Sequence, residues 1–174
     1  MFHVMNKTIT HRVFLGLGGN LGRPLDCFIA ARRQLAEDPH IEVIAGSPVY
    51  QTPAIGGPPG QADYLNAVLE IGTSRSPRQL HHLCREIEAA CGRSRGVRWA
   101  ARTLDIDLLF FGPVIADEAR LTLPHPRLHS RHFVLLPLAD LAPGLRHPRL
   151  RRTVNELLSA LPEPVGIRKI LEKW

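Results

Sequence analysis

The stretch from Arg98 to Phe111, RWAARTLDIDLLFF, constrains the fold of this chain more than any other segment. Asp105 and Asp107 alternate with apolar residues, so a β-strand would place both carboxylates on one face, about 7 Å apart. The residues after Asp107 are apolar at every position, which predicts a central strand whose far end is buried. Carboxylates at the edge of a core must be paired, hydrogen-bonded or bound to a metal ion.

Two kinds of partner would satisfy these carboxylates. Ion pairs with Arg98 or Arg102 would give a solvated cluster, which is the ordinary outcome for an isolated D-x-D pattern. Alternatively, the carboxylates would bind Mg²⁺, which uses one or two carboxylates and completes its shell with water and substrate phosphate. The same stretch also supplies cations for phosphate and the flat ring of Trp99, and this combination favours a nucleotide site.

This stretch resembles the signature of the hydroxymethyl-dihydropterin pyrophosphokinases (HPPK), which are enzymes of the folate pathway. In that signature a basic residue, a small pair and an arginine precede D-[I/L]-D and two aliphatic residues, and residues 98–109 fit it. The resemblance implies ATP-dependent transfer of pyrophosphate to 6-hydroxymethyl-7,8-dihydropterin, giving the pterin diphosphate and AMP. It also implies two Mg²⁺ ions bound by Asp105 and Asp107, with Arg93 and Arg102 as further catalytic residues.

Length, charge and cysteine content set the frame for this interpretation. A chain of 174 residues is long enough for one domain with a full core, and its formal charge of +6 suits either nucleic acid or a small polyphosphate. The three cysteines form no C-x-x-C pair, and no apolar run approaches the length of a membrane span. We expect a cytoplasmic monomer without nucleic-acid or membrane partners, with residues 1–12 as an N-terminal extension and 13–174 as an HPPK-like domain.

Tyr64 and Asn66 share one face of the strand expected over residues 64–71, next to a loop rich in glycine and proline at 51–61. A tyrosine can stack on a heterocycle and an amide can match its polar edge, although a cross-strand tyrosine and a structural asparagine would give the same pattern. The family's Y-x-T-P loop followed by Y-L-N implies a pterin pocket here. By that resemblance its residues are Thr52, Pro53, Ala54, Ile55, Tyr64, Asn66 and Phe133.

The expected ATP site draws on three further segments. Arginines at 93, 95 and 98 form either a solvated charge run or a loop that closes over phosphate. Glu88 lies at the edge of the apolar face of its helix, and is either solvated or, by resemblance, near the substrates. Residues 120–126 resemble a second family signature, R-L-x-[V/L]-P-H-P. The implied ATP-binding residues are Glu88, Arg95, Arg98, Trp99, Arg102, Arg120, Thr122, His125 and Arg131.

Helix and turn signals complete the pattern. Three helices are expected. The first covers residues 25–37, the second begins at a capping box of Ser76 and Gln79 and ends at Gly92, and the third begins at a cap at Ser130 and ends at Leu138. A strand is expected over 41–50, and the glycine-rich turn at 18–22 is either a tight turn or a phosphate cradle. Histidines at 125, 129 and 132 suggest a metal site, but the prolines around His125 and the lack of a carboxylate partner disfavour it.

The order strand, helix, strand, strand, helix, strand, with further helices after it, predicts a single-domain α+β ferredoxin-like fold. In such a fold a mainly antiparallel sheet is packed with helices. Two other function classes stay open. An RNA-binding module would share the fold, but its aromatic pattern G-F-G-F-V-x-F is absent. A metal-dependent phosphohydrolase would use the same aspartates and arginines without a pterin.

Overall fold

The six-stranded sheet has the order β5-β1-β4-β3-β8, and β2 pairs with β4 beside β3. In this computed structural model the structure describes residues 9–54, 59–93 and 100–174. All pairs in this sheet are antiparallel, so the predicted α+β ferredoxin-like fold is confirmed. The strands are β1 (His11–Gly19), β2 (Ile41–Gly46), β3 (Val49–Thr52), β4 (Tyr64–Thr73), β5 (Asp105–Phe111) and β8 (Arg168–Leu171), and a separate hairpin joins β6 (Ala116–Glu118) to β7 (Leu121–Leu123).

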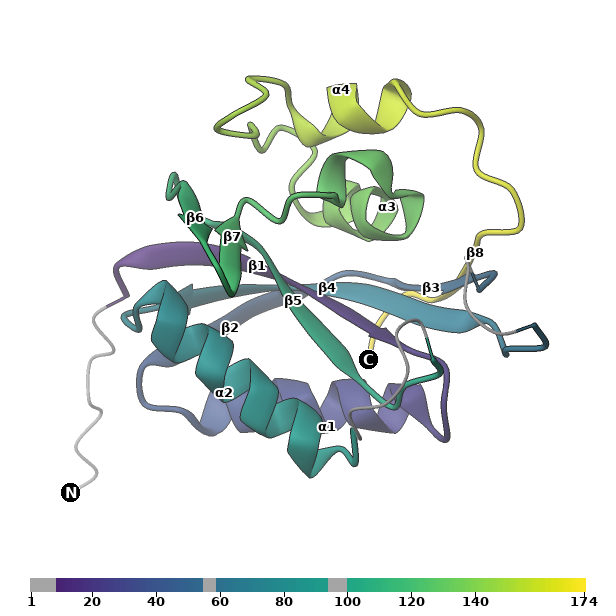
Figure 1. Ribbon diagram of the computed structural model, residues 1–174, viewed down its shortest axis with the longest axis horizontal. Helices are drawn as coiled ribbons and strands as arrows, with labels where there is room; N and C mark the ends of the chain where they lie inside the picture. The colour runs from purple at the N-terminus through teal and green to yellow at the C-terminus, as the bar shows by residue number, and fades with distance from the viewer. Residues whose placement is uncertain (1–8, 55–58, 94–99) are drawn as a thin grey trace.

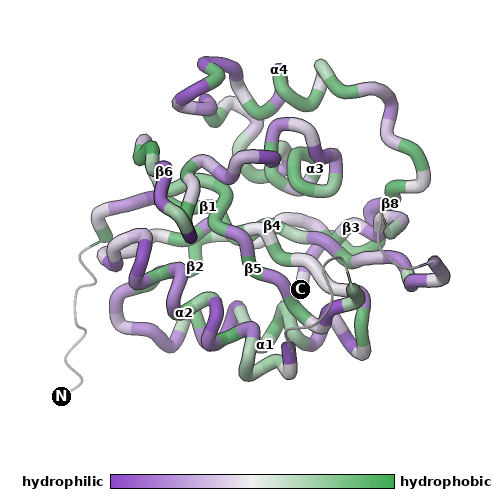
Figure 2. The backbone as a smooth tube through the Cα atoms, viewed as in Figure 1, coloured by the Kyte–Doolittle hydropathy of each residue, from purple (hydrophilic) through white to green (hydrophobic). Residues whose placement is uncertain are grey.

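Helices cover both faces of the sheet (Figure 1). On one face α1 (Pro24–Glu37) and α2 (Pro77–Ala90) bury Phe28, Leu80 and neighbouring apolar residues against the strands. On the other face α3 (His132–Leu141) and α4 (Val154–Ser159) pack around Phe14 and Phe110. Along α1 and α2 apolar and polar residues alternate in the way expected of helices that pack by one face (Figure 2).

β5 is an edge strand, so the prediction of a central strand is wrong. Its last four residues are nevertheless buried, as expected, because the segment after β7 covers its outer edge. The backbone N–H of His125 donates a hydrogen bond to the carbonyl oxygen of Leu109 at 3.0 Å, and Leu123 and Leu128 are fully buried there. A non-local segment therefore provides the burial that a further strand was expected to provide.

The strand expected over 41–50 is divided into β2 and β3 at Ser47 and Pro48. Ser47 is fully buried, and its hydroxyl accepts a hydrogen bond from the backbone N–H of Val68 at 2.8 Å. Pro48 has no N–H for the ladder, so the chain turns here before pairing again with β4. This break places Thr52 directly opposite Tyr64 in the sheet.

Helix ends follow the sequence signals with one exception. α2 has both hydrogen bonds of the Ser76–Gln79 capping box, and Gly92 after it has a φ of 76°. Ser130 does not cap α3, because it lies in a short 3₁₀ turn (Leu128–Ser130) and its hydroxyl donates to the carbonyl oxygen of Arg127. β1 begins at His11, inside the expected N-terminal extension of residues 1–12.

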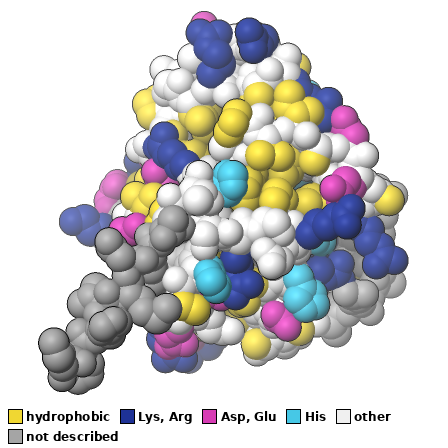
Figure 3. All heavy atoms as spheres, turned by 90° about the vertical axis from the view of Figure 1, so that its left-hand side faces the viewer, with side chains coloured by type: hydrophobic (Ala, Val, Ile, Leu, Met, Phe, Trp, Pro, Cys, Tyr) yellow, Lys and Arg dark blue, Asp and Glu magenta, His cyan; other side chains and the backbone are white. Residues whose placement is uncertain are grey.

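Basic side chains form several separate groups on the face that Figure 3 shows, with histidines and acidic residues between them. Within the described ranges, every helix is too short or too polar to cross a lipid bilayer.

His147 links α4 and its preceding loop to the core. The side chain is buried, its Nδ1 accepts hydrogen bonds from the backbone N–H groups of Arg149 and Leu150 at 3.3 and 3.2 Å, and its ring meets Phe110 edge-on. Burial, with smaller contributions from His129 and Arg149, lowers the pKa of His147. A protonated imidazole has no acceptor at Nδ1, so the fold favours the neutral ring.

We predict that Ser47→Ala lowers the free energy of unfolding by about 1–3 kcal/mol, because the buried N–H of Val68 loses its acceptor. Urea denaturation would measure the change. Ser159→Ala, an equivalent substitution at an exposed position on α4, serves as the control. Equal stability of the two variants would show that the hydrogen bond at the β2–β3 break contributes nothing.

We also predict that His147 makes stability depend on pH below about 6.5. As the pH falls through this value the unfolded chain takes up a proton that the folded chain resists, so stability is complete above it and declines towards the lowered folded pKa. Urea denaturation at about pH 7.5 and about pH 5.5 should show a smaller loss in His147→Asn, whose side-chain oxygen keeps an acceptor without titrating. The same loss in both proteins would contradict the assignment.

Candidate active site

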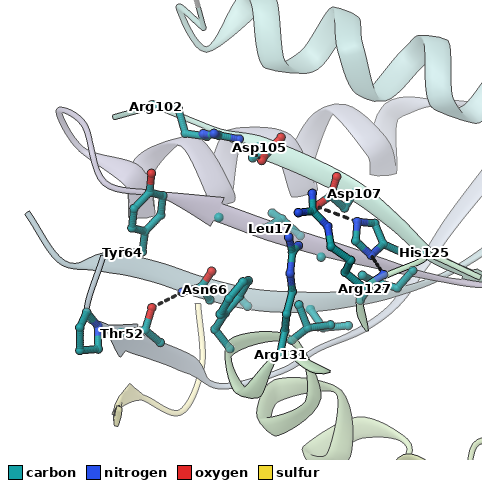
Figure 4. Close-up of a pocket in the computed structure, with 18 of the residues that line it drawn as sticks. Leu17, Thr52, Tyr64, Asn66, Arg102, Asp105, Asp107, His125, Arg127 and Arg131 are labelled. Atoms are coloured by element: carbon teal, nitrogen blue, oxygen red, sulfur yellow. Dashed lines mark hydrogen bonds and ion pairs between the residues drawn. The ribbon is translucent and has the colours of Figure 1, made fainter. Parts of the chain in front are cut away.

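A cleft of about 340 Å³ opens between the sheet and α3, and its walls carry most of the predicted site residues (Figure 4). Acidic and basic side chains line the cleft, together with aromatic rings and a side-chain amide. The predicted residues in its lining are Thr52, Pro53, Tyr64, Asn66, Arg93, Arg102, Asp105, Asp107, His125, Arg131 and Phe133. These residues, which the sequence places in four separate segments, therefore share one cavity.

Glycines in β1 form the floor of this cleft. Gly16 lies opposite Asp107 and Gly18 lies opposite Asp105, while on the other side Gly18 lies opposite Asn66. A Cβ atom at Gly18 would come within 3.2 Å of the Asn66 Oδ1 atom. Because neither position has a side chain, β1 leaves an open trough between the carboxylates and the amide. The sequence signal for this floor was the alternation G-L-G at the end of β1, which sequence reasoning did not interpret.

The two aspartates of β5 have different surroundings. Asp105 accepts a hydrogen bond from Arg93 Nη1 at 2.6 Å and pairs with Arg102 through its other oxygen. Asp107 makes no ion pair with an arginine or lysine among the described residues, and its one contact within 4 Å of a basic side-chain nitrogen is at 3.9 Å to Nε2 of the neutral His125 ring. Its withdrawal from bulk water, and then repulsion from Asp105, raise the pKa of Asp107 to about 6. Asp105 thus forms the expected ion-pair cluster, and Asp107 keeps its oxygens available to a cation.

Glu88 supports this edge from the opposite side of β5. It is buried, accepts a hydrogen bond from the backbone N–H of Ile106 at 2.8 Å, and pairs with Arg93. Burial raises the pKa of Glu88 to about 7, although Ile106 and Arg93 oppose the shift. The alternative of a solvated helix glutamate is therefore wrong. Glu88 faces a second hollow of about 400 Å³, which also includes His81 and Arg85 from α2 and both aspartates.

The opposite end of the cleft is apolar and aromatic with one buried amide. Asn66 Nδ2 donates a hydrogen bond to Thr52 Oγ1 at 2.8 Å, and both side chains are buried. This bond fixes the plane of the amide. Tyr64 lies on the same strand and Phe133 comes from α3, with the guanidinium of Arg131 5.4 Å from the Phe133 ring centre.

His125 and two arginines complete the polar wall. His125 Nδ1 accepts the backbone N–H of Arg127 at 3.2 Å, so its proton is assigned to Nε2, the atom that faces Asp107. Burial and the charges of Arg131 and Arg127 lower the pKa of His125 to about 4, which keeps the ring neutral at pH 7. Within the described ranges no group of three or more His, Cys, Asp or Glu side chains is arranged to bind a metal.

Some predicted residues lie elsewhere. Arg120 and Thr122 lie on the hairpin of β6 and β7 and do not line the cleft, and neither does Ala54. Ile55, Arg95, Arg98 and Trp99 lie outside the described residues.

Sequence reasoning missed Arg127 and Asn20. Arg127 lines the cleft next to Arg131, and its only signal was a cation directly after P-H-P. Asn20 joins two loops: its Oδ1 accepts the Arg102 backbone N–H at 3.0 Å, and its Nδ2 donates to the Ala62 carbonyl oxygen at 3.1 Å. A Cβ atom at Gly19 would come within 2.5 Å of the Thr103 carbonyl oxygen. The glycine-rich turn is therefore a close-packed turn that ties both sides of the cleft together.

The cleft combines four kinds of side chain that together could bind one polyphosphate and one flat heterocycle. Guanidinium groups bind phosphate oxygens, the carboxylate of Asp107 can bind a divalent cation, aromatic rings stack on a heterocycle, and the oriented amide recognises its edge.

Comparisons with known proteins agree with this geometry. Residues 14–143 match the family described as 7,8-dihydro-6-hydroxymethylpterin-pyrophosphokinase (HPPK). A 2-amino-4-hydroxy-6-hydroxymethyldihydropteridine pyrophosphokinase from Synechocystis sp. is 42% identical over 148 residues, which cover 85% of this chain and 75% of the relative. The enzyme of the same name from Pseudomonas aeruginosa is 41% identical over 151 residues, 87% of this chain and 92% of the relative.

Solved structures share the fold. A crystal structure of an HPPK-DHPS triple mutant from Plasmodium falciparum superposes with a TM-score of 0.66 at 15% identity, covering 86% of this chain and 43% of that chain. The wild-type protein crystallised with pteroate gives a TM-score of 0.65 at 15% identity, covering 89% and 43%. This chain thus spans less than half of those structures. From the family match and the identity to its bacterial relatives, the chain belongs to the 7,8-dihydro-6-hydroxymethylpterin-pyrophosphokinase family.

Proposed function

We propose that this chain transfers a pyrophosphoryl group from ATP to 6-hydroxymethyl-7,8-dihydropterin, giving the pterin diphosphate and AMP in folate biosynthesis. The observation that carries the proposal is the single cleft in which the aspartates of β5 and the Asn66 amide face each other across Gly16 and Gly18. One end of this cleft suits a triphosphate and the other a flat heterocycle. As a member of the HPPK family, the chain is a pyrophosphokinase.

The aromatic end of the cleft is the proposed pterin pocket. Tyr64 and Phe133 approach it from the sheet and from α3, so a pterin ring can stack between these two elements. Asn66 would recognise the polar edge of the ring, and Thr52 holds the amide in place through the 2.8 Å hydrogen bond. We include Pro53, which lines the cleft, and retain Ala54 and Ile55 as proposals from family resemblance.

The arginine-rich end is the proposed ATP site. The hydroxymethyl oxygen would attack the β-phosphorus, the bond from that phosphorus to the α-phosphate oxygen would break, and AMP would leave with the electron pair. Arg93, Arg102 and Arg131, together with Arg127, are positioned to steady the phosphates and the charge that develops on them. Family resemblance adds Glu88, Arg95, Arg98, Trp99, Arg120, Thr122 and His125 to the proposed nucleotide contacts.

Asp105 and Asp107 fit a magnesium site. Mg²⁺ takes one or two carboxylates and fills its shell with water and phosphate, so the lack of a third acidic ligand among the described residues is compatible with it. Burial, and then repulsion from Asp105, raise the pKa of Asp107, and the charge of a bound cation would offset both by favouring the ionised carboxylate. Two bound Mg²⁺ ions would neutralise charge on the triphosphate and on the attacking and leaving oxygens.

We further propose that the protein is a cytoplasmic monomer that acts on small molecules only. An RNA-binding sheet needs an open face with exposed aromatic residues, but helices cover both faces here (Figure 1). A phosphohydrolase that acts on ATP without a pterin would not need the aromatic end of the cleft, so the presence of Tyr64 and Phe133 there favours the pyrophosphokinase.

An assay of ATP turnover with and without 6-hydroxymethyl-7,8-dihydropterin tests the proposed reaction. We expect AMP to form only when Mg²⁺ and the pterin are both present, and the pterin diphosphate to appear in equal amount. ADP or phosphate released at the same rate without pterin would identify a phosphohydrolase. No turnover, with salt-sensitive binding of RNA, would favour the binding module instead.

We predict that Asp107→Asn lowers kcat by roughly 10²-fold or more, because the carboxylate proposed to bind Mg²⁺ becomes a neutral amide. The fold should be as stable or slightly more stable at pH 7, since the raised pKa of Asp107 shows that its charged form is unfavourable in the folded chain. Steady-state kinetics and thermal denaturation measure both effects.

Asp26→Asn is the matched control for this substitution. It removes an exposed carboxylate of α1 that pairs with Arg23, and we expect no change in kcat. Wild-type kcat in Asp107→Asn would remove Asp107 from the proposed metal site.

A further inference from the structure

Residues 164–174, which we call the strap, lie outside the span of residues 14–143 that matches the family. They cross the edge of the sheet, where β8 pairs with β3 from Val49 to Gln51. All four residues of β8 are exposed, so the pairing adds little to the hydrophobic core. β8 therefore contributes more through the segments that it holds in place than through the apolar surface that it buries.

Trp174 anchors one end of the strap. Its Nε1 donates a hydrogen bond to the carbonyl oxygen of Ser47 at 2.7 Å, at the break between β2 and β3. Its ring packs on Phe28 with 5.8 Å between ring centres, and the Arg32 guanidinium lies over the ring and donates to the Trp174 backbone oxygen. Hydrogen bond, aromatic packing and cation contact together fix this residue against α1 and the start of β3.

The other end of the strap touches the proposed pterin pocket. Gly166 has a φ of 72°, and a Cβ atom there would come within 2.8 Å of the Pro53 Cγ atom. The strap backbone thus lies directly against Pro53, which lines the cleft. Arg168 Nη2 donates to Gln51 Oε1 at 3.3 Å, and Gln51 Nε2 donates to Asp63 Oδ2 at 2.9 Å, next to the start of β4.

The middle of the strap connects β3 to the opposite wall. Lys169 Nζ lies 3.3 Å from Asp140 Oδ1, and Tyr50 donates its hydroxyl to Asp140 Oδ2 at 2.5 Å. Lys169 also lies over the Tyr50 ring. Asp140 belongs to α3, the helix that presents Phe133 to the cleft. The same strand therefore contacts the Pro53 wall and the helix that provides the facing aromatic wall.

We propose that the strap is a positioning element that sets the spacing of the Pro53 and Phe133 walls and thereby the affinity for the pterin. This inference rests on the proposed function and adds a determinant of substrate binding to it. β3 has only four residues and pairs with β4 over three, so without β8 it would be a short edge strand of the sheet. The phosphate end, on β5 and the segment around His125, is held by its own ion pairs and hydrogen bonds.

The test compares full-length variants by equilibrium binding of two probes, 6-hydroxymethylpterin and the magnesium complex of α,β-methylene ATP. Trp174→Ala releases the anchored end of the strap. Gly166→Ala leaves that anchor intact and pushes a methyl group against Pro53. Gly112→Ala is the matched control, because Gly112 also has a positive φ, of 50°, but the nearest atom to a Cβ there is 3.9 Å away.

We expect Trp174→Ala and Gly166→Ala to weaken pterin binding by about five- to twentyfold, while nucleotide binding changes by less than about twofold. Hydrogen exchange at the β3 amides should be faster in Trp174→Ala than in the wild type, because β3 loses the support of the fixed strap. Gly112→Ala should bind both probes as the wild type does. Arg32→Ala, compared with its exposed neighbour Arg33→Ala, repeats the test with little change to the core.

Three results would overturn the proposal. Unchanged pterin affinity in both strap variants would show that the strap does not set the pocket. Equal loss of pterin and nucleotide binding, or equal loss in Gly112→Ala, would show a general effect on the fold. Failure of the wild-type protein to bind pterin would reject the proposed function itself and the strap's role with it, and this outcome is distinct because it appears before any substitution.

Discussion

The repulsion between two neighbouring carboxylates on β5 shapes most of this site. Burial of Asp107, and then the nearby charge of Asp105, raise the pKa of Asp107. The chain compensates Asp105 with Arg93 and Arg102 and leaves Asp107 without a close cation among the described residues. Glu88 then holds Arg93 from behind the strand. The result is one satisfied carboxylate that fixes the arginines and one unsatisfied carboxylate whose charge calls for a cation.

The carboxylates face an open trough because the neighbouring strand has no side chains there. Gly16 and Gly18 separate the aspartates from Val68 and Asn66 across the sheet, and a larger residue at either position would fill the trough. This arrangement also explains why the site lies on a sheet face that is otherwise covered by helices. The open space is a gap in the packing that the glycines of β1 create.

Sequence patterns predicted the parts of the site that depend on local geometry. Strand alternation is a property of the backbone itself, so the shared face of Asp105 and Asp107, and that of Tyr64 and Asn66, followed directly from the spacing. The family signatures placed these residues in one site, and the capping box at Ser76 set the start of α2 because its hydrogen bonds lie within four residues.

Features that depend on distant segments were not predictable in this way. β5 was expected at the centre of the sheet, but its burial comes from the segment that includes His125, over a dozen residues further along the chain. The division between β2 and β3 depends on the hydrogen bond that the Val68 N–H donates to the Ser47 hydroxyl. The contacts of the Asn20 side chain likewise depend on loops that lie more than forty residues away along the chain. Local periodicity contains no information about such partners, so only the folded structure reveals them.

The two ends of the cleft also obtain their rigidity in different ways. The phosphate end is built on β5, where ion pairs and a covered edge restrain each side chain. The proposed pterin end depends on β3, whose side chains are joined by hydrogen bonds to α3, to β4 and to the strap, so these neighbouring segments hold it. A change in the segments that support β3 would therefore alter the affinity of the proposed pterin end. The ion pairs of the proposed phosphate end would stay intact.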